Sequence, residues 1–129
     1  HNRKEAVYQR FLPEVLNDLA ESVDIARLAD IAKDKIILDP GVGFGKTYEH
    51  NLEVLRHLEE FEWLGYPMLL GTSRKSVIGL TLDLPAGERE EGTMVTTVEA
   101  VRAGWNFVRV HNIRANARAI KMAEAIYRS

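Results

Sequence analysis

The sequence predicts an α/β fold in which parallel strands alternate with helices in the order α-β-α-β-α-β-α. Three short apolar runs, 36–38, 68–70 and 107–111, are separated by segments with helical periodicity. Two runs lead directly into loops rich in glycine and charge, and the third carries its charges on itself. Charged residues at the carboxyl ends of buried parallel strands are typical of the active sites of α/β barrels and doubly wound sheets.

The first half of the chain is predicted to hold a helix, a strand and a second helix. Apolar residues recur from Leu12 to Leu28 with a period close to 3.6, and Pro13 is placed in the first turn of this helix. Strand Ile36–Leu38 follows a short polar turn. The apolar residues between positions 52 and 61 then predict the second helix, which stops before a glycine.

The second half is predicted to hold two more strands and two more helices. In chain order these are Met68–Leu70, Thr93–Ala103, Phe107–His111 and Ala115–Tyr127. The stretch before Thr93 has a weaker pattern, and we expect its charged run, Glu88–Glu91, to be a solvated turn. Near-continuous apolar strands between amphipathic helices indicate a parallel sheet with right-handed crossovers.

These elements predict only part of a larger domain. The first helix has no strand before it, and three strands cannot close a barrel. A (β/α)₈ TIM barrel usually needs about 250 residues. We therefore expect residues 1–129 to be the carboxyl-terminal half of a single barrel domain whose amino-terminal half is absent.

Composition excludes several classes of function. The chain has 129 residues, is 46% hydrophobic and carries a formal net charge of −2. This balance predicts no nucleic-acid partner and no membrane surface, and no apolar run approaches the ~18 residues of a membrane span. The sequence therefore predicts a cytoplasmic protein. With no cysteine and four scattered histidines, it predicts no metal site within this part of the chain.

The first loop, Asp39–Lys46, is rich in glycine but does not fit the spacing of a nucleotide-binding loop. A P-loop would need glycine at the position of Pro40, and a dinucleotide fingerprint would need glycine at the position of Lys46. Asp39 follows a buried strand, so its carboxylate must either cap local backbone amides or bind a polar ligand. An ionised carboxylate there could accept paired N–H donors from a heterocyclic ring.

The other two strand ends carry cations. Lys75 could act as a point-charge donor and Ser76 as a hydroxyl at a helix start, although this motif alone could be only a polar turn. Because side chains alternate along a strand, Arg109 and His111 share one face. They form a candidate anion site if the strand is interior, or a solvated face if it is an edge.

Taken together, the motifs Asp39–Lys46, Gly71–Ser76 and Arg109–His111, in this order and spacing, resemble the dihydropteroate synthase family over the whole chain. The resemblance implies a barrel enzyme of folate synthesis. It would condense 6-hydroxymethyl-7,8-dihydropterin diphosphate with 4-aminobenzoate to give dihydropteroate and diphosphate, and sulfonamides would compete with 4-aminobenzoate.

The resemblance also implies residue roles. Asp39, Gly71 and Lys75 match residues that bind the pterin, and Phe44, Lys75 and Ser76 match residues at the aminobenzoate end of the site. The pair matching the diphosphate-binding residues is Arg109 and His111. Lys75, Asp39, Arg109 and His111 would thus carry the catalysis.

Further expectations concern what lies outside these motifs. Asn112 stands where the family usually has aspartate, so any charge supplied to the histidine from there is absent. The family's Mg²⁺-associated asparagine belongs to the missing half, so this chain alone is expected to be inactive. The family is usually a homodimer through its last helices.

The residues leave two alternative functions open. A pterin-binding, corrinoid-dependent methyltransferase of related barrel fold is one, although the Ser73–Ser76 motif argues against it. A non-catalytic barrel half that serves as a binding module is the other.

Overall fold

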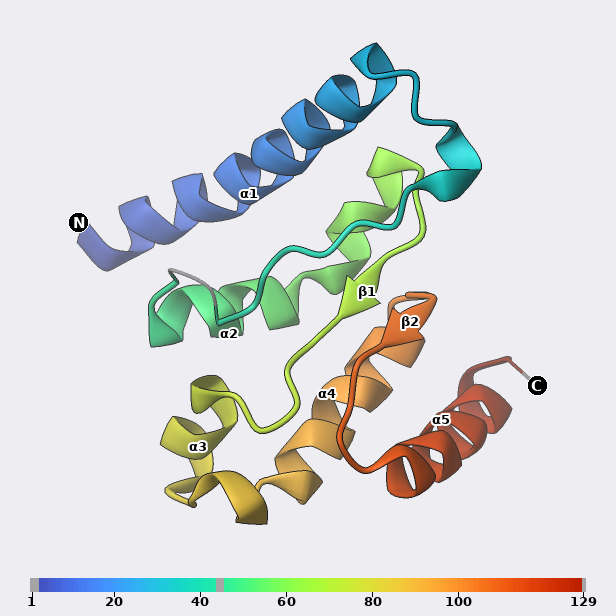
Figure 1. The fold of residues 1–129 in the computed structure, drawn as a ribbon. Helices are drawn as coiled ribbons and strands as arrows, with labels where there is room; N and C mark the ends of the chain where they lie inside the picture. The colour runs from blue at the N-terminus through green and yellow to red at the C-terminus, as the bar shows by residue number, and fades with distance from the viewer. Residues whose placement is uncertain (1–2, 44–45, 129) are drawn as a thin grey trace.

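The computed structural model describes residues 3–43 and 46–128, with side chains from residue 11 onward. Its strands are parallel. β1 (Leu69–Leu70) pairs with β2 (Phe107–Val108), and Leu38 forms a parallel bridge with Met68 on the other side of β1. The helices follow one another around these strands from α1, in blue, to α5, in red (Figure 1). The predicted alternation of parallel segments and helices is therefore confirmed, but the predicted strand Ile36–Leu38 is reduced to the single bridge at Leu38.

Helix α1 (Arg3–Leu28) is longer than the periodicity predicted. Its buried residues, Leu12, Val15, Leu16 and Val23, follow the expected period. Residues 3–11 contain neither glycine nor proline, so nothing stops the helix from beginning earlier. The expectation that Pro13 lies in the first turn was therefore wrong, because Pro13 is inside the helix, with its side chain exposed.

The second predicted helix is divided into α2 (Tyr48–Arg56) and the 3₁₀ helix η2 (Leu58–Leu64). Side chains three residues apart lie on the same side of a 3₁₀ helix. In η2 these are Leu58 and Phe61, and both are fully buried. The Trp105 indole nitrogen also donates to the Leu58 carbonyl oxygen at 2.8 Å. Tertiary packing thus replaces the last α-helical turn that periodicity predicted.

The region of weak pattern, where the sequence indicated no more than a helix start at Ser76, holds a complete helix, α3 (Ser76–Leu82). Gly79 and the β-branched residues Val77 and Ile78 give it low helical propensity, but all three are buried, so packing stabilises it. The expected solvated turn at 88–91 was also wrong. Residues 88–91 instead belong to the end of the 3₁₀ helix η3 (Ala86–Glu88) and to the first turn of α4 (Glu90–Arg102), where acidic side chains interact favourably with the helix dipole.

The last predicted strand and helix are both present with changed bounds. Backbone pairing assigns only Phe107–Val108 to β2, although the Arg109 amide still donates to the Leu70 carbonyl at 2.9 Å. Exposure keeps alternating through His111, as the strand pattern predicted. Helix α5 (Ile113–Arg128) starts after Asn112, whose Oδ1 accepts the Ala115 amide at 3.0 Å as an N-cap.

The core lies between one face of the strands and the helices. From the strands it includes Leu38, Met68 and Leu70, which pack in one cluster with Val54 and Phe61. The opposite strand face is open, since Ile37 is 51% exposed and Phe107 is 46% exposed. In a closed barrel this second face lines the interior.

Candidate active site

β1, β2 and the segment that bridges at Leu38 bring their charged loops to one edge of the sheet. Leu38 bridges Met68, and Leu69 pairs with Phe107, so the residues that follow each strand emerge side by side. A Cβ placed on Gly71 would lie 3.9 Å from both the Lys75 Nζ and the Arg109 Cβ. Residues from two separate predicted motifs are thus neighbours in the fold.

Asp39 caps the backbone of its own loop. Its Oδ1 accepts the Gly41 amide at 2.7 Å, and the Lys46 Nζ donates to the Gly41 carbonyl at 3.0 Å. Burial lowers the pKa of Lys46, and the charge of Asp39 opposes that effect. Of the two roles considered from the sequence, capping is therefore present in the geometry. The carboxylate is exposed, and its second oxygen can accept a hydrogen bond from a ligand.

Lys75 spans the gap between the second loop and the first. Its Nζ donates to the Val42 carbonyl at 2.6 Å, and its side chain crosses Gly43, where an added Cβ would lie 3.0 Å from the Lys75 Cδ. Gly43 has a φ of +91°, a conformation that favours glycine. Burial lowers the pKa of the Lys75 amine, Asp39 opposes this shift, and the nearby cations Arg109 and Lys46 reinforce it.

Arg109 and His111 both project from the open face of the last strand. Both are exposed, whereas the intervening Val110 is half-buried. The Ser73 hydroxyl lies 2.8 Å from the His111 Nδ1 and also accepts the His111 amide at 3.2 Å. The second and third loops are therefore connected directly at the histidine.

Ser76 is the first residue of α3 and is exposed, directly after Lys75. Phe44 lies outside the described residues. Asn112 is turned toward the start of α5, because its Oδ1 accepts the Ala115 amide. Asn112 therefore still caps the helix although it lacks the charge of an aspartate, since an amide oxygen accepts this hydrogen bond as well.

Sequence reasoning missed Asn51, which holds the first loop. Asn51 is only 2% exposed, and its Oδ1 accepts the Gly43 amide at 2.9 Å. A signal for it existed, because Asn51 occupies the same helical face as Val54 and Leu58. A polar residue on an apolar stripe needs a buried hydrogen-bond partner.

Sequence reasoning also missed a buried polar network on α4. Thr96 bonds to Thr72 at the start of the second loop, and Thr97 donates to the Asn116 Oδ1 of α5 at 2.7 Å. The Asn116 Nδ2 donates to Glu90 at 2.7 Å and to the Asn112 carbonyl at 2.8 Å. Helix α4 therefore anchors the second loop and, through α5, the residue that follows His111.

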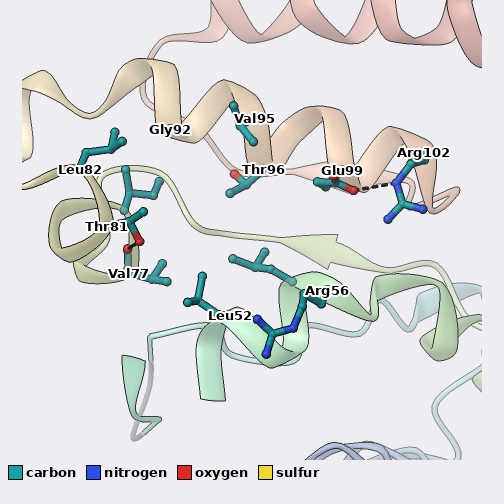
Figure 2. A pocket seen from close by; sticks show the side chains of 12 residues that line it. Leu52, Arg56, Val77, Thr81, Leu82, Gly92, Val95, Thr96, Glu99 and Arg102 are labelled. Atoms are coloured by element: carbon teal, nitrogen blue, oxygen red, sulfur yellow. Dashed lines mark hydrogen bonds and ion pairs between the residues drawn. The ribbon is translucent and has the colours of Figure 1, made fainter. Parts of the chain in front are cut away.

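A separate cavity of about 450 Å³ lies among α2, α3 and α4 (Figure 2). Its lining is largely aliphatic, with Glu99 and Arg102 joined by a 2.7 Å hydrogen bond at its rim. The lining includes none of Asp39, Lys75, Arg109 and His111. We therefore place the candidate active site at the strand ends and not in this cavity.

A parallel α/β segment that gathers an acid and several cations at its strand ends has the arrangement of an active site at the carboxyl edge of an α/β barrel. The family model "Pterin binding enzyme" matches residues 1–111, and the chain belongs to this family. Its curated relatives include a dihydropteroate synthase of Clostridium beijerinckii, 53% identical over 129 residues, which cover 99% of this chain and 48% of that protein.

Solved structures agree with this assignment. A dihydropteroate synthase from Clostridium difficile, determined in the presence of pteroic acid, matches with a TM-score of 0.89 and 49% identity, covering 92% of this chain and 45% of that one. The enzyme from Thermus thermophilus, in complex with 4-aminobenzoate, matches with a TM-score of 0.85 and 38% identity, covering 91% and 47%. The chain thus spans about half the length of these relatives and has the fold of part of a (β/α)₈ barrel.

Proposed function

We propose that this chain is the carboxyl-terminal half of a dihydropteroate synthase, and that an amino-terminal half completes the barrel in the full-length protein. The observation that carries the proposal is the meeting of Asp39, Lys75 and Arg109 at the edge where β1, β2 and the parallel bridge at Leu38 end. Exposed Ile37 and Phe107 on the open strand face support a missing half, because a closed barrel would bury them.

The pterin is assigned to Asp39, Gly71 and Lys75. The outer carboxylate oxygen of Asp39 can accept N–H groups from the ring edge, and Gly71 leaves space beside the Lys75 amine for a flat ring. Lys75 also faces the aminobenzoate end, which we assign to Lys75, Ser76 and Phe44. Sulfonamides would compete for that end.

The diphosphate is assigned to Arg109 and His111. In the proposed reaction the bond between the pterin methylene carbon and the diphosphate oxygen breaks, and the amine nitrogen forms a bond to that carbon and loses a proton. Positive charge develops on the pterin as diphosphate leaves. An anionic Asp39 on the ring and cationic Arg109 at the leaving group stabilise that separation of charge. A free arylamine needs only to be oriented.

The proposal extends to the metal, the oligomer and the location. Within residues 11–43 and 46–128, no group of three or more His, Cys, Asp or Glu side chains could hold a metal ion. As the family resemblance implies, the proposal assigns the Mg²⁺ ion to the other half and to no step here. Exposed Met122 and Ile126 on α5 support a homodimer through the last helices. In the described part of the chain no helix has the length and apolarity of a membrane span. A cytoplasmic location is a separate part of the proposal.

The test is product formation by the full-length protein. Purified protein with both substrates should form dihydropteroate, and Lys75→Ala should abolish turnover while the circular dichroism spectrum of the folded protein stays unchanged. Lys35→Ala is the matched control, since Lys35 is exposed, lies outside the three motifs and precedes the apolar run 36–38 that Asp39 follows. Turnover near wild type in Lys75→Ala would refute the assignment. Methyl transfer without dihydropteroate would favour the methyltransferase, and no chemistry with retained pterin binding would favour a binding module.

A further inference from the structure

His111 has two ring nitrogens, and the structure distinguishes between them. Nδ1 lies 2.8 Å from the Ser73 Oγ, while Nε2 has no hydrogen-bond partner among the described residues. A neutral imidazole carries one proton, so one nitrogen donates and the other accepts. Only an Nε2 that carries the proton can donate to an anion on the exposed side of the strand. Which nitrogen is protonated therefore decides whether His111 attracts a diphosphate oxygen or repels it.

The surroundings of Ser73 settle this choice. Its Oγ already accepts the His111 backbone amide at 3.2 Å, and the residue is only 8% exposed. A serine hydroxyl has one proton to donate, and the His111 Nδ1 is the one acceptor recorded for it in the described part of the chain. If Nδ1 carried the proton instead, the Ser73 hydroxyl would accept twice, and its own buried proton would have no partner. Leaving a buried donor unsatisfied is costly.

We infer that Ser73 is a positioning residue that holds the neutral His111 ring with its proton on Nε2, aimed at the leaving diphosphate. The inference rests on the proposed function for the identity of the anion. Arg109 then supplies fixed charge, and His111 supplies a directed neutral donor. Because Ser73 and Lys75 belong to the same loop, the loop assigned to the pterin also orients the group assigned to the diphosphate.

The wild-type protein provides the first test, with no variant to fold. In the full-length protein labelled with ¹⁵N-histidine, two-bond ¹⁵N–¹H spectra at a pH where the ring is neutral should show His111 with a protonated Nε2 and an unprotonated Nδ1. The His111→Gln variant identifies the resonances. A protonated Nδ1 in the wild type would overturn the inference. In Ser73→Ala the His111 signals should move toward a mixture of tautomers, and unchanged signals there would remove Ser73 from the role.

Inorganic diphosphate provides the second test, by calorimetry. A glutamine places its amide where Nε2 lies, and an asparagine places its amide where Nδ1 lies. His111→Gln should therefore bind diphosphate about tenfold more tightly than His111→Asn, and the reverse order would contradict the assignment. Ser73→Ala should weaken binding about threefold to tenfold, and Ser73→Thr should restore part of it by returning the hydroxyl.

A matched control and a separate readout keep the two proposals distinguishable. Ser22→Ala removes an exposed hydroxyl on α1 and should leave diphosphate affinity unchanged. A wild-type protein that forms no dihydropteroate would refute the proposed function and leave the tautomer result standing. An active wild type with its His111 proton on Nδ1 would refute this inference alone.

Discussion

Replacing Asn116 by alanine tests whether the polar network on α4 stabilises the part of the barrel that carries the site. Asn116 is 1% exposed and accepts from Thr97, which is also 1% exposed. Its amide nitrogen donates to Glu90 and to the Asn112 carbonyl. The substitution therefore removes three side-chain hydrogen bonds between α4, α5 and the residue after His111.

The magnitude follows from these contacts. Each of the two neutral bonds contributes about 1 kcal/mol, and the bond to the half-buried Glu90 carboxylate contributes about 1 to 1.5 kcal/mol once solvent screening is allowed for. Alanine returns about 0.5 kcal/mol through its higher helix propensity. We therefore expect Asn116→Ala to lower the free energy of unfolding by about 2.5 to 3 kcal/mol.

The assay is urea unfolding of the full-length protein, followed by circular dichroism. Asn17→Ala makes the same change at an exposed position of α1 and should alter the free energy of unfolding by no more than about 0.5 kcal/mol. In a double-mutant cycle with Thr97→Val, the coupling energy should be about 1 kcal/mol. A loss below about 1 kcal/mol in Asn116→Ala would refute the reasoning, because it would mean that the network contributes no more than a surface contact.

Three further predictions concern the site. Arg109→Ala should weaken inorganic diphosphate binding about tenfold to a hundredfold in calorimetry, because hydrogen bonds to a charged group contribute about 1.5 to 3 kcal/mol; unchanged affinity would count against the anion role. Gly43→Ala and Gly65→Ala both place a Cβ at positive φ, but only Gly43 is crowded by Lys75. Both should therefore lose about 1 kcal/mol of stability, only Gly43→Ala should also lose turnover, and equal turnover in the two variants would contradict the positioning of Lys75. Asp39→Asn removes the charge that opposes the lowering of the Lys75 pKa, so that pKa should fall further and the alkaline limit of activity should move to lower pH. A pH titration of the Lys75 ε-carbon by NMR checks the sign, and a pKa equal to or above that of the wild type would show that Asp39 does not act on Lys75.

Local sequence determined most of the helices, because a helix that buries one face must repeat apolar residues at its own period. Leu12, Leu16 and Val23 are buried as that period requires. Where packing outweighed propensity, prediction failed. Gly79 interrupts the pattern of α3, and the charged run 88–91 predicts a solvated turn although Glu90 and Glu91 begin α4.

The sequence by itself placed Asp39, Lys75, Arg109 and His111 at strand ends, because a charge beside a short apolar run is a local property of the chain. It also determined that Arg109 and His111 share a face, since alternation along a strand is local too. Contacts between residues distant along the chain were decided only by the tertiary structure. Lys75 meets Val42 across 33 residues, and Ser73 meets His111 across 38. No periodicity encodes such pairs, because they depend on which strands become neighbours and in which register.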